Sequence, residues 1–189
     1  HKSSGKPAAL SDEEYEEIAA ATLKEAKFGF IILKKFGDKD DIKKAAEKGA
    51  GFIRIGSNIT EVAQIEDMVK YSKDLGLMVV IALMKSYAVK PNREYIKILK
   101  DLKKWGADLV TLMDSAGYML PEDVKNYINM GKVNTDIELG FHAHNNLQLA
   151  IANTVTAIET GADSVDVSIG GLGRSAGNAP IEILKAIAD

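Results

Sequence analysis

Two histidines separated by a single residue are the side chains best suited to chemistry in this chain. His142 and His144 lie in the segment 140–146, which reads GFHAHNN, and the only other histidine is His1. Side chains on a β-strand point alternately to opposite faces, so these two imidazoles would point the same way. They are therefore placed either to bind one metal ion together or to hydrogen-bond to the backbone as half-buried polar groups.

Two charged residues interrupt other apolar, strand-like runs. Asp166 lies in the run 164–170, where the alternation places it on the same inner face as Ser168 and Gly170. There its carboxylate would either orient a metal-bound imidazole or be satisfied by the backbone or a buried arginine. Arg54 lies in the run 52–56 and should also point inward. It needs a partner, which is either a carboxylate such as that of Asp166 or a carboxylate of the substrate.

Further polar residues follow the ends of apolar runs. Asp114 and Ser115 end the run 109–114 and begin a loop. They would bind substrate oxygens, or Asp114 would start the loop as an Asx turn. Lys85 follows the run 78–83 and suggests a Schiff-base aldolase. No residue near Lys85 in the sequence would lower its pKa, so the sequence favours an exposed loop lysine.

A glycine-rich segment, GGLGRSAGNAP at 170–180, follows the last strand-like run. Such a turn lets backbone amides approach an anion at the start of a helix, so Gly173 is a candidate for substrate binding. Asn178 would either add an oxygen ligand to the two imidazoles or cap the helix that begins near Pro180.

Six strand-like runs, separated by amphipathic segments, would position these residues. They cover 28–33, 52–56, 78–83, 109–114, 137–144 and 164–170. Their starts differ by 24, 26, 31, 28 and 27 residues, about the length of one strand and one crossover helix. Regular βα units predict a parallel sheet, either a barrel or a doubly wound layer. The first run is not followed by Gly-x-Gly-x-x-Gly, which disfavours dinucleotide binding.

Length and composition restrict the protein class. The 189 residues, 46% hydrophobic and 27% charged, suit one globular domain. A net charge of −3 with interspersed signs provides no basic face for nucleic acid. No apolar run approaches the roughly 20 residues needed to cross a bilayer, so we expect no membrane association. The absence of cysteine excludes thiolate metal sites and fits a cytoplasmic protein.

The motifs together resemble those of the metal-dependent TIM-barrel lyase superfamily. This superfamily contains the 4-hydroxy-2-oxovalerate aldolases, the hydroxymethylglutaryl-CoA (HMG-CoA) lyases, and the isopropylmalate, citramalate and homocitrate synthases. The resemblance spans about 49–187 and rests on the segments 140–146, 170–173 and 177–180, with Arg54 and the run 113–117. His-x-His-Asn-Asn and Gly-Asn-Ala-Pro are most similar to the hydroxy-oxoacid aldolases. Gln148, where the family usually has glycine, and Arg174, reminiscent of the synthases, depart from that branch.

The resemblance implies an architecture. The chain would hold strands three to eight of a (β/α)₈ TIM barrel and lack the first two βα units, since a full barrel needs eight strands and about 250 residues. Residues 1–189 would form a single partial barrel domain, with 1–10 as a polar loop or a start introduced by cloning. Two open sheet edges would then remain, so we expect either that the first quarter of the barrel exists but is absent from this sequence, or that another chain covers the gap, as in a homo-oligomer.

The resemblance also implies roles for the candidate residues. A Mg²⁺ or Mn²⁺ ion would be bound by His142, His144 and Asn178, with a further aspartate ligand in the missing part. The general base would also lie in the missing part. Substrate contacts and support of the ligands are expected from a second group of residues: Arg54, Asp114, Ser115 and Gly173 would bind substrate, and Asp166 and Asn145 would orient the ligands.

The leading functional hypothesis is a metal-dependent aldolase that converts a 4-hydroxy-2-oxo acid into pyruvate and an aldehyde. The fragment alone would be inactive, and the resemblance suggests an aldehyde dehydrogenase partner. One alternative is an acyl-CoA-dependent Claisen synthase or lyase, or a carboxyltransferase, of the same superfamily. A different alternative is a catalytically silent barrel fragment that serves in assembly or regulation.

Overall fold

A computed structural model describes residues 9–188 of the chain. Of the segment expected to be a polar loop, residues 1–8 lie outside this range, and the first helix begins at Asp12 with Ser11 as its cap. The elements in chain order are α1 (Asp12–Thr22), β1 (Gly29–Leu33), α2 (Lys39–Glu47), β2 (Phe52–Asn58), η1 (Ile59–Ile65), α3 (Glu66–Asp74), β3 (Met78–Met84), η2 (Ser86–Ala88), α4 (Arg93–Trp105), β4 (Leu109–Asp114), α5 (Pro121–Asn134), β5 (Glu138–Ala143), α6 (Ala150–Glu159), β6 (Ser164–Asp166), η3 (Ile169–Gly171) and α7 (Ile181–Ala188).

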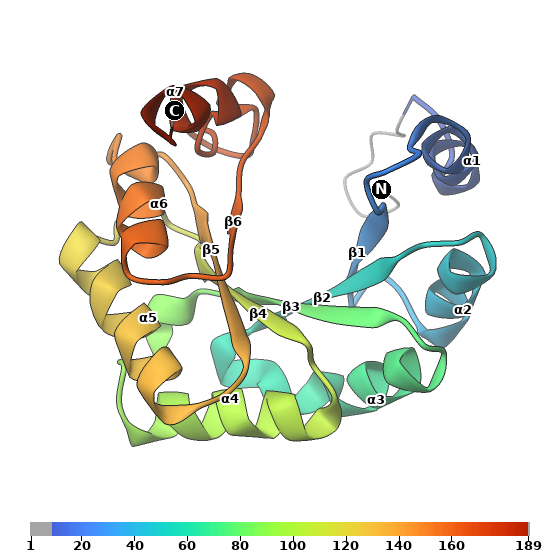
Figure 1. Cartoon of the computed structure of the whole chain (residues 1–189). Helices are drawn as coiled ribbons and strands as arrows, with labels where there is room; N and C mark the ends of the chain where they lie inside the picture. Colours follow the sequence, from blue (N-terminus) through green and yellow to red (C-terminus); the bar gives the residue numbers. More distant parts are fainter. Residues whose placement is uncertain (1–8, 189) are drawn as a thin grey trace.

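The strands form one parallel sheet in the order β1-β2-β3-β4-β5-β6. Figure 1 shows the sheet curving like part of a barrel wall, with β1 and β6 at its two sides and α2 to α6 along its convex face. The strand order never reverses, which excludes a doubly wound layer. The prediction of a partial (β/α)₈ barrel is therefore confirmed.

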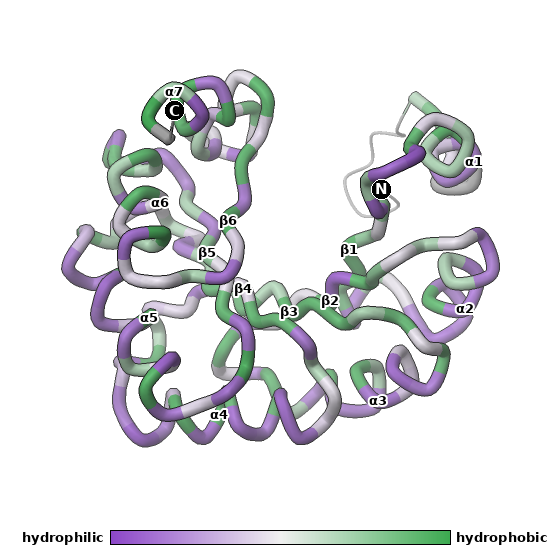
Figure 2. The backbone as a smooth tube through the Cα atoms, viewed as in Figure 1, coloured by the Kyte–Doolittle hydropathy of each residue, from purple (hydrophilic) through white to green (hydrophobic). Residues whose placement is uncertain are grey.

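The hydrophobic core lies between the sheet and the helices on its convex face. Helix α4 shows why: Tyr95, Leu99 and Leu102 recur at helical spacing, form one stripe, and are fully buried. Strand β3 is apolar on both faces and buried along most of its length, as a central parallel strand must be. Figure 2 shows the same division, with hydrophobic strands inside and hydrophilic residues along the outer helices. In the part of the chain that the structure describes, no helix is long and apolar enough to cross a membrane.

The last strand is shorter than the sequence predicts. β6 ends at Asp166, whereas the apolar run suggested a strand up to Gly170. Among the described strands β6 pairs only with β5, so nothing on its other side keeps the chain extended. Ser168 instead bridges to Pro180, and Ile169–Gly171 form a short 3₁₀ turn. The expectation that Ser168 and Gly170 continue the inner face of the strand is therefore wrong.

Candidate metal centre

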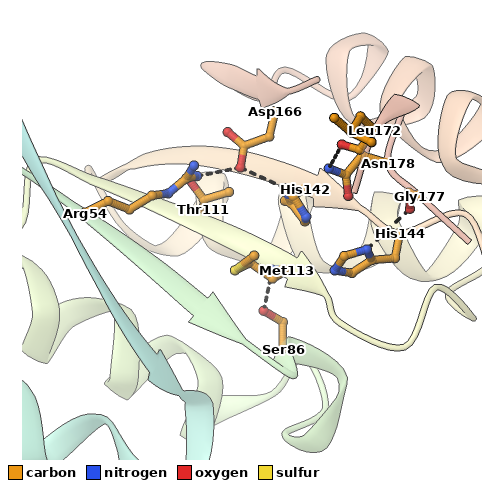
Figure 3. Close-up of polar contacts among 10 residues, drawn as sticks. All are labelled: Arg54, Ser86, Thr111, Met113, His142, His144, Asp166, Leu172, Gly177 and Asn178. Atoms are coloured by element: carbon orange, nitrogen blue, oxygen red, sulfur yellow. Dashed lines mark hydrogen bonds and ion pairs between the residues drawn. The ribbon is translucent and has the colours of Figure 1, made fainter. Parts of the chain in front are cut away.

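The first histidine is held by a carboxylate on the neighbouring strand. His142 of β5 pairs in register with Asp166 of β6, and its Nδ1 lies 3.0 Å from the Asp166 Oδ2. The same Oδ2 accepts a hydrogen bond of 2.6 Å from Arg54 Nη2, which also donates to Thr111 Oγ1 at 2.7 Å. Figure 3 shows this row of side chains from four strands on one face of the sheet. The inward orientation of Arg54 agrees with its alternation along β2.

The charge state of Asp166 determines which ring nitrogen of His142 carries a proton. Burial raises the pKa of Asp166, but the hydrogen bond from His142 and the adjacent Arg54 charge outweigh burial, so the pKa lies below its usual value. An ionised carboxylate only accepts hydrogen bonds, so the Nδ1 of His142 must carry the donated proton. In the neutral imidazole Nε2 then keeps its lone pair. Asp166 thus orients the ring in the way that metal-binding histidines are usually oriented.

The second histidine is fixed by a different acceptor. His144 Nδ1 lies 3.3 Å from the carbonyl oxygen of Gly177, which can only accept, so Nδ1–H donates and Nε2 is left with its lone pair. The two rings are 5.0 Å apart between centroids and inclined at 79°. Burial lowers the pKa of His144, and the neighbouring His142 adds to this effect, which favours the neutral form that binds a metal ion.

Asn178 provides a third donor beside the two imidazoles. Its Nδ2 donates to the carbonyl of Leu172 at 3.1 Å, and a β-bridge joins its backbone to His144. Its Oδ1 is buried and has no hydrogen-bond partner among the described residues, so it does not cap the following helix. Figure 3 shows this oxygen on the side of Asn178 that faces the imidazoles. Gly173 packs so closely on Asn178 that any Cβ at position 173 would overlap the amide.

These donors suit a divalent metal ion in part. Two imidazole nitrogens and one amide oxygen are ordinary ligands, and the orphaned Asn178 Oδ1 is a buried acceptor that a cation would satisfy. Within residues 9–188 no group of three or more His, Cys, Asp or Glu side chains converges on one point.

Three residues expected near the substrate or the ligands are engaged in shaping loops. The Asp114 carboxylate is fully buried and accepts hydrogen bonds from the backbone N–H groups of Tyr118 and Met119 at 3.2 and 2.9 Å, as in the loop-starting alternative. Ser115 Oγ accepts from the N–H of Lys85 at 2.9 Å. Asn145 Oδ1 accepts from the first N–H of α6 at 3.1 Å, so its side chain caps that helix.

Sequence reasoning missed two contributors to this site. Thr111 is a buried polar residue within the otherwise apolar β4, and that contrast was a signal that its hydroxyl has a specific partner, Arg54. Gly177 contributes only its carbonyl, which accepts from His144 Nδ1 and, at 2.9 Å, from the N–H of Asn145. A backbone acceptor that lies more than thirty residues from its partner leaves no pattern in the sequence.

The chain is similar in sequence to proteins of one family. The family model described as HMGL-like matches residues 5–188. A 4-hydroxy-2-oxovalerate aldolase of Carboxydothermus hydrogenoformans is 42% identical over 95% of this chain and 53% of its own length. The aldolase of the same name from Desulfitobacterium hafniense is 38% identical over 96% of this chain and 54% of its own. The chain thus spans about half the length of these curated relatives.

Solved structures share the fold. The N-terminal domain of a candidate aldolase from Bacteroides vulgatus superposes with a TM-score of 0.81 at 28% identity, over 96% of this chain and 64% of the other. An HMG-CoA lyase from Brucella melitensis superposes with a TM-score of 0.77 at 17% identity, over 92% of this chain and 70% of the other. At that identity the second likeness shows the fold alone.

Proposed function

The chain belongs to the HMGL-like family, and from that premise we propose that it is the metal-binding part of a divalent-metal-dependent lyase that acts on a 2-oxo acid. The most specific form of the proposal is a 4-hydroxy-2-oxo acid aldolase that releases pyruvate and an aldehyde. One observation carries it: two imidazoles, both held through Nδ1, lie beside an amide oxygen that has no partner among the described residues.

The reaction needs negative charge to be stabilised next to a carbonyl. The bond between C3 and C4 of the substrate breaks, the proton of the C4 hydroxyl passes to a base, and C4 becomes the aldehyde carbon. The electron pair stays on the pyruvate half as an enolate, which then takes up a proton at C3. A divalent ion supplies Lewis-acid stabilisation of the charge that develops on the 2-oxo oxygen. We propose Mg²⁺ or Mn²⁺ for this role.

The residues of this chain would hold and orient that ion. His142, His144 and Asn178 provide the donor atoms. Asp166 fixes the tautomer of His142, and Arg54 keeps Asp166 ionised. Gly173 has no side chain and so leaves room for the Asn178 amide, and its backbone N–H would bind an anionic substrate oxygen. The remaining ligand, expected to be an aspartate, and the base are not among the residues to which we assign roles.

The test is metal-dependent turnover of the intact protein. After treatment with a chelator, pyruvate release from 4-hydroxy-2-oxopentanoate should be absent and should return on titration with Mn²⁺ or Mg²⁺. His144→Ala should abolish the recovery while the far-UV circular dichroism stays unchanged, because His144 follows the end of β5 and is not part of the hydrophobic core cluster. Pyruvate release that does not depend on metal, or that survives His144→Ala, would contradict the proposal. Cleavage of an acyl-CoA substrate instead would favour the lyase branch of the family.

A further inference from the structure

One row of inward side chains crosses the sheet at the level of His142, and part of this row is apolar. The strand register places Met113 of β4 on one side of His142 and Asp166 of β6 on the other. The pairing of β3 with β4 ends one residue before Met84 and Met113, so Met84 continues the row on β3. Asn58 of β2 pairs with Met84 in turn. Because neighbouring strands lie about 5 Å apart, the two thioether side chains stand next to each other, between Asn58 and the histidine.

Met113 is the last inward side chain of β4. The hydroxyl of Thr111 binds Arg54 on the inner face, so alternation turns Met113 inward as well, and the strand ends one residue later. In a (β/α)₈ barrel the active site lies at this carboxyl end of the strands, whereas inward residues nearer the other end fill the interior. Figure 3 shows Met113 beside the imidazoles of His142 and His144. Its side chain therefore belongs to the part of the barrel wall that borders the candidate metal centre.

A buried serine holds the backbone of Met113 in place. The main-chain pairing with β3 has already ended at this level, and the N–H of Met113 donates instead to Ser86 Oγ at 3.1 Å. Ser86 is fully buried, and its hydroxyl donates to the carbonyl of Leu83 at 2.7 Å, which leaves the oxygen free to accept. The hydroxyl thus replaces one bond of the sheet. The base of the Met113 side chain is fixed relative to β3 on one side and to His142 on the other.

The two methionines differ from their apolar neighbours on the other face of the sheet. Leu83 and Leu112, which point toward the helices, are fully buried in the hydrophobic core. Met84 and Met113 are only partly buried and are not part of that core cluster. They therefore keep apolar surface on the concave side of the sheet. A methionine side chain is unbranched and polarisable, so it can adapt to small apolar groups of different shape.

This surface is suited to the carbon chain of a substrate. A 2-oxo acid held by a metal ion at His142 and His144 turns its carboxylate and 2-oxo oxygens toward the ion, and its remaining carbons are left to contact the pocket wall. A hydroxyl or charged group placed against two thioethers would lose water without gaining a hydrogen bond, whereas an alkyl group would gain from burial.

We propose that Met113, supported by Met84, contacts the substituent on C4 of the 4-hydroxy-2-oxo acid and selects a short alkyl group there. This proposal rests on the proposed function and specifies its substrate class: the aldehyde product is a small alkanal without a hydroxylated or charged end. Met113 is then a specificity-determining residue and makes no bond to the metal ion.

The cleavage test compares two substrates of equal size in the intact, Mn²⁺-loaded protein. 4-Hydroxy-2-oxohexanoate ends in a methyl group where 4,5-dihydroxy-2-oxopentanoate ends in a hydroxyl group. We expect kcat/KM to be about tenfold higher for the first compound, a difference typical of an apolar pocket. Met113→Gln, which keeps the length of the side chain and adds a polar end, should remove most of this preference. Met113→Leu, which stays apolar at similar volume, should keep it.

Two controls show whether the effect is local. Met78 is also partly buried and points inward from β3, but it lies six residues before Met84, about 20 Å away at the opposite end of the strand. Met78→Gln should leave the preference unchanged. The Mn²⁺ affinity of Met113→Gln, measured by calorimetry, should equal that of the parent protein. A loss of affinity would show that Met113 acts on the ion, and would overturn the proposal.

Binding separates this proposal from the proposed function. 2-Oxopentanoate and 4-hydroxy-2-oxobutanoate are also equal in size and differ in the same terminal group. Calorimetry with the Mn²⁺-loaded protein should show tighter binding of 2-oxopentanoate, and Met113→Gln should remove the difference. If this preference holds but no hydroxy-oxo acid is cleaved, the proposed reaction fails and the apolar contact stands. If the two compounds bind equally well, if neither binds, or if the preference survives Met113→Gln, the role of Met113 is wrong.

Discussion

Replacing Asp166 with asparagine removes the negative charge that pairs with Arg54 and accepts the hydrogen bond of His142. Its Oδ2 accepts both hydrogen bonds, and the Asp166 and Arg54 side chains are only 21% and 22% exposed. A hydrogen bond to a charged group contributes about 1.5–3 kcal/mol, and a fully buried charge without its partner costs about 3–5 kcal/mol. Asparagine keeps one acceptor, and solvent screens part of the charge. We therefore expect the free energy of unfolding to fall by about 2 kcal/mol.

The measurement is urea denaturation of the metal-free intact protein at pH 7, as a double-mutant cycle with Arg54→Met. In the double variant no charge is left without a partner, so it should be no less stable than Asp166→Asn alone. Asp166→Asn should separately weaken Mn²⁺ binding about 10- to 100-fold, because the His142 ring loses its orienting acceptor. A stability change below about 0.5 kcal/mol, or strictly additive losses in the cycle, would refute the argument.

Three further outcomes follow from the structure. Burial raises the pKa of Asp163, but hydrogen bonds from Lys132 and the N–H of Leu139 lower it further, to below its usual value. The ionised Asp163 therefore stabilises the fold fully above the pKa that it has in the unfolded chain, and this stabilisation is lost on acidification. Asp163→Asn should lower the free energy of unfolding by about 1 kcal/mol at pH 7. Urea titrations should show that this difference between variant and parent shrinks below about pH 4. Gln148 has a left-handed φ of 59°, so Gln148→Gly should stabilise the fold by about 1 kcal/mol, and a lower melting temperature would contradict this. Removal of the metal with a chelator should lower the melting temperature of the intact protein, and the loss should vanish in His144→Ala.

The regular spacing of apolar runs predicted the fold because each βα unit repeats the same pattern of one buried strand followed by one amphipathic helix. The six apolar runs correspond to the six strands, and their order in the sheet follows the chain. A run of apolar residues does not show where pairing stops, however. The chain leaves the sheet after Asp166 although Val167 and Ile169 continue the alternation, because β6 pairs with β5 alone among the described strands. Where a strand ends depends on the strands that pair with it, and this pairing is set by the tertiary structure rather than by the local sequence.

The candidate site was predictable where it depended on strand alternation. Alternation placed His142, Asp166 and Arg54 on one face, and the structure joins them by hydrogen bonds. Beyond the strand ends, alternation no longer applies. There Asp114 and Asn145, expected to serve the substrate and the ligands, accept hydrogen bonds from backbone amides of the next loop and helix. Short polar side chains in loops have backbone donors within reach, so local capping competes with any functional role.

The motif Gly-Ala-Asp occurs twice, and only part of its role can be inferred from the local sequence. The sequence Gly-Ala-Asp ends α4 at 106–108 and recurs after α6 at 161–163. Its glycine ends the helix, as Gly106 does with a φ of 109°, and that role can be recognised from the sequence.

The aspartate of the motif does something that the sequence does not reveal. Asp108 accepts from the N–H of Val79 and from Lys73, and Asp163 accepts from the N–H of Leu139 and from Lys132. Each carboxylate therefore fastens the start of one strand to the preceding strand and helix, 24 to 35 residues back in the chain. These bonds lie at the end of the barrel opposite the candidate metal centre. Substitution of Asp108 or Asp163 should thus change stability and leave metal affinity unaltered, the reverse of the pattern expected for His144.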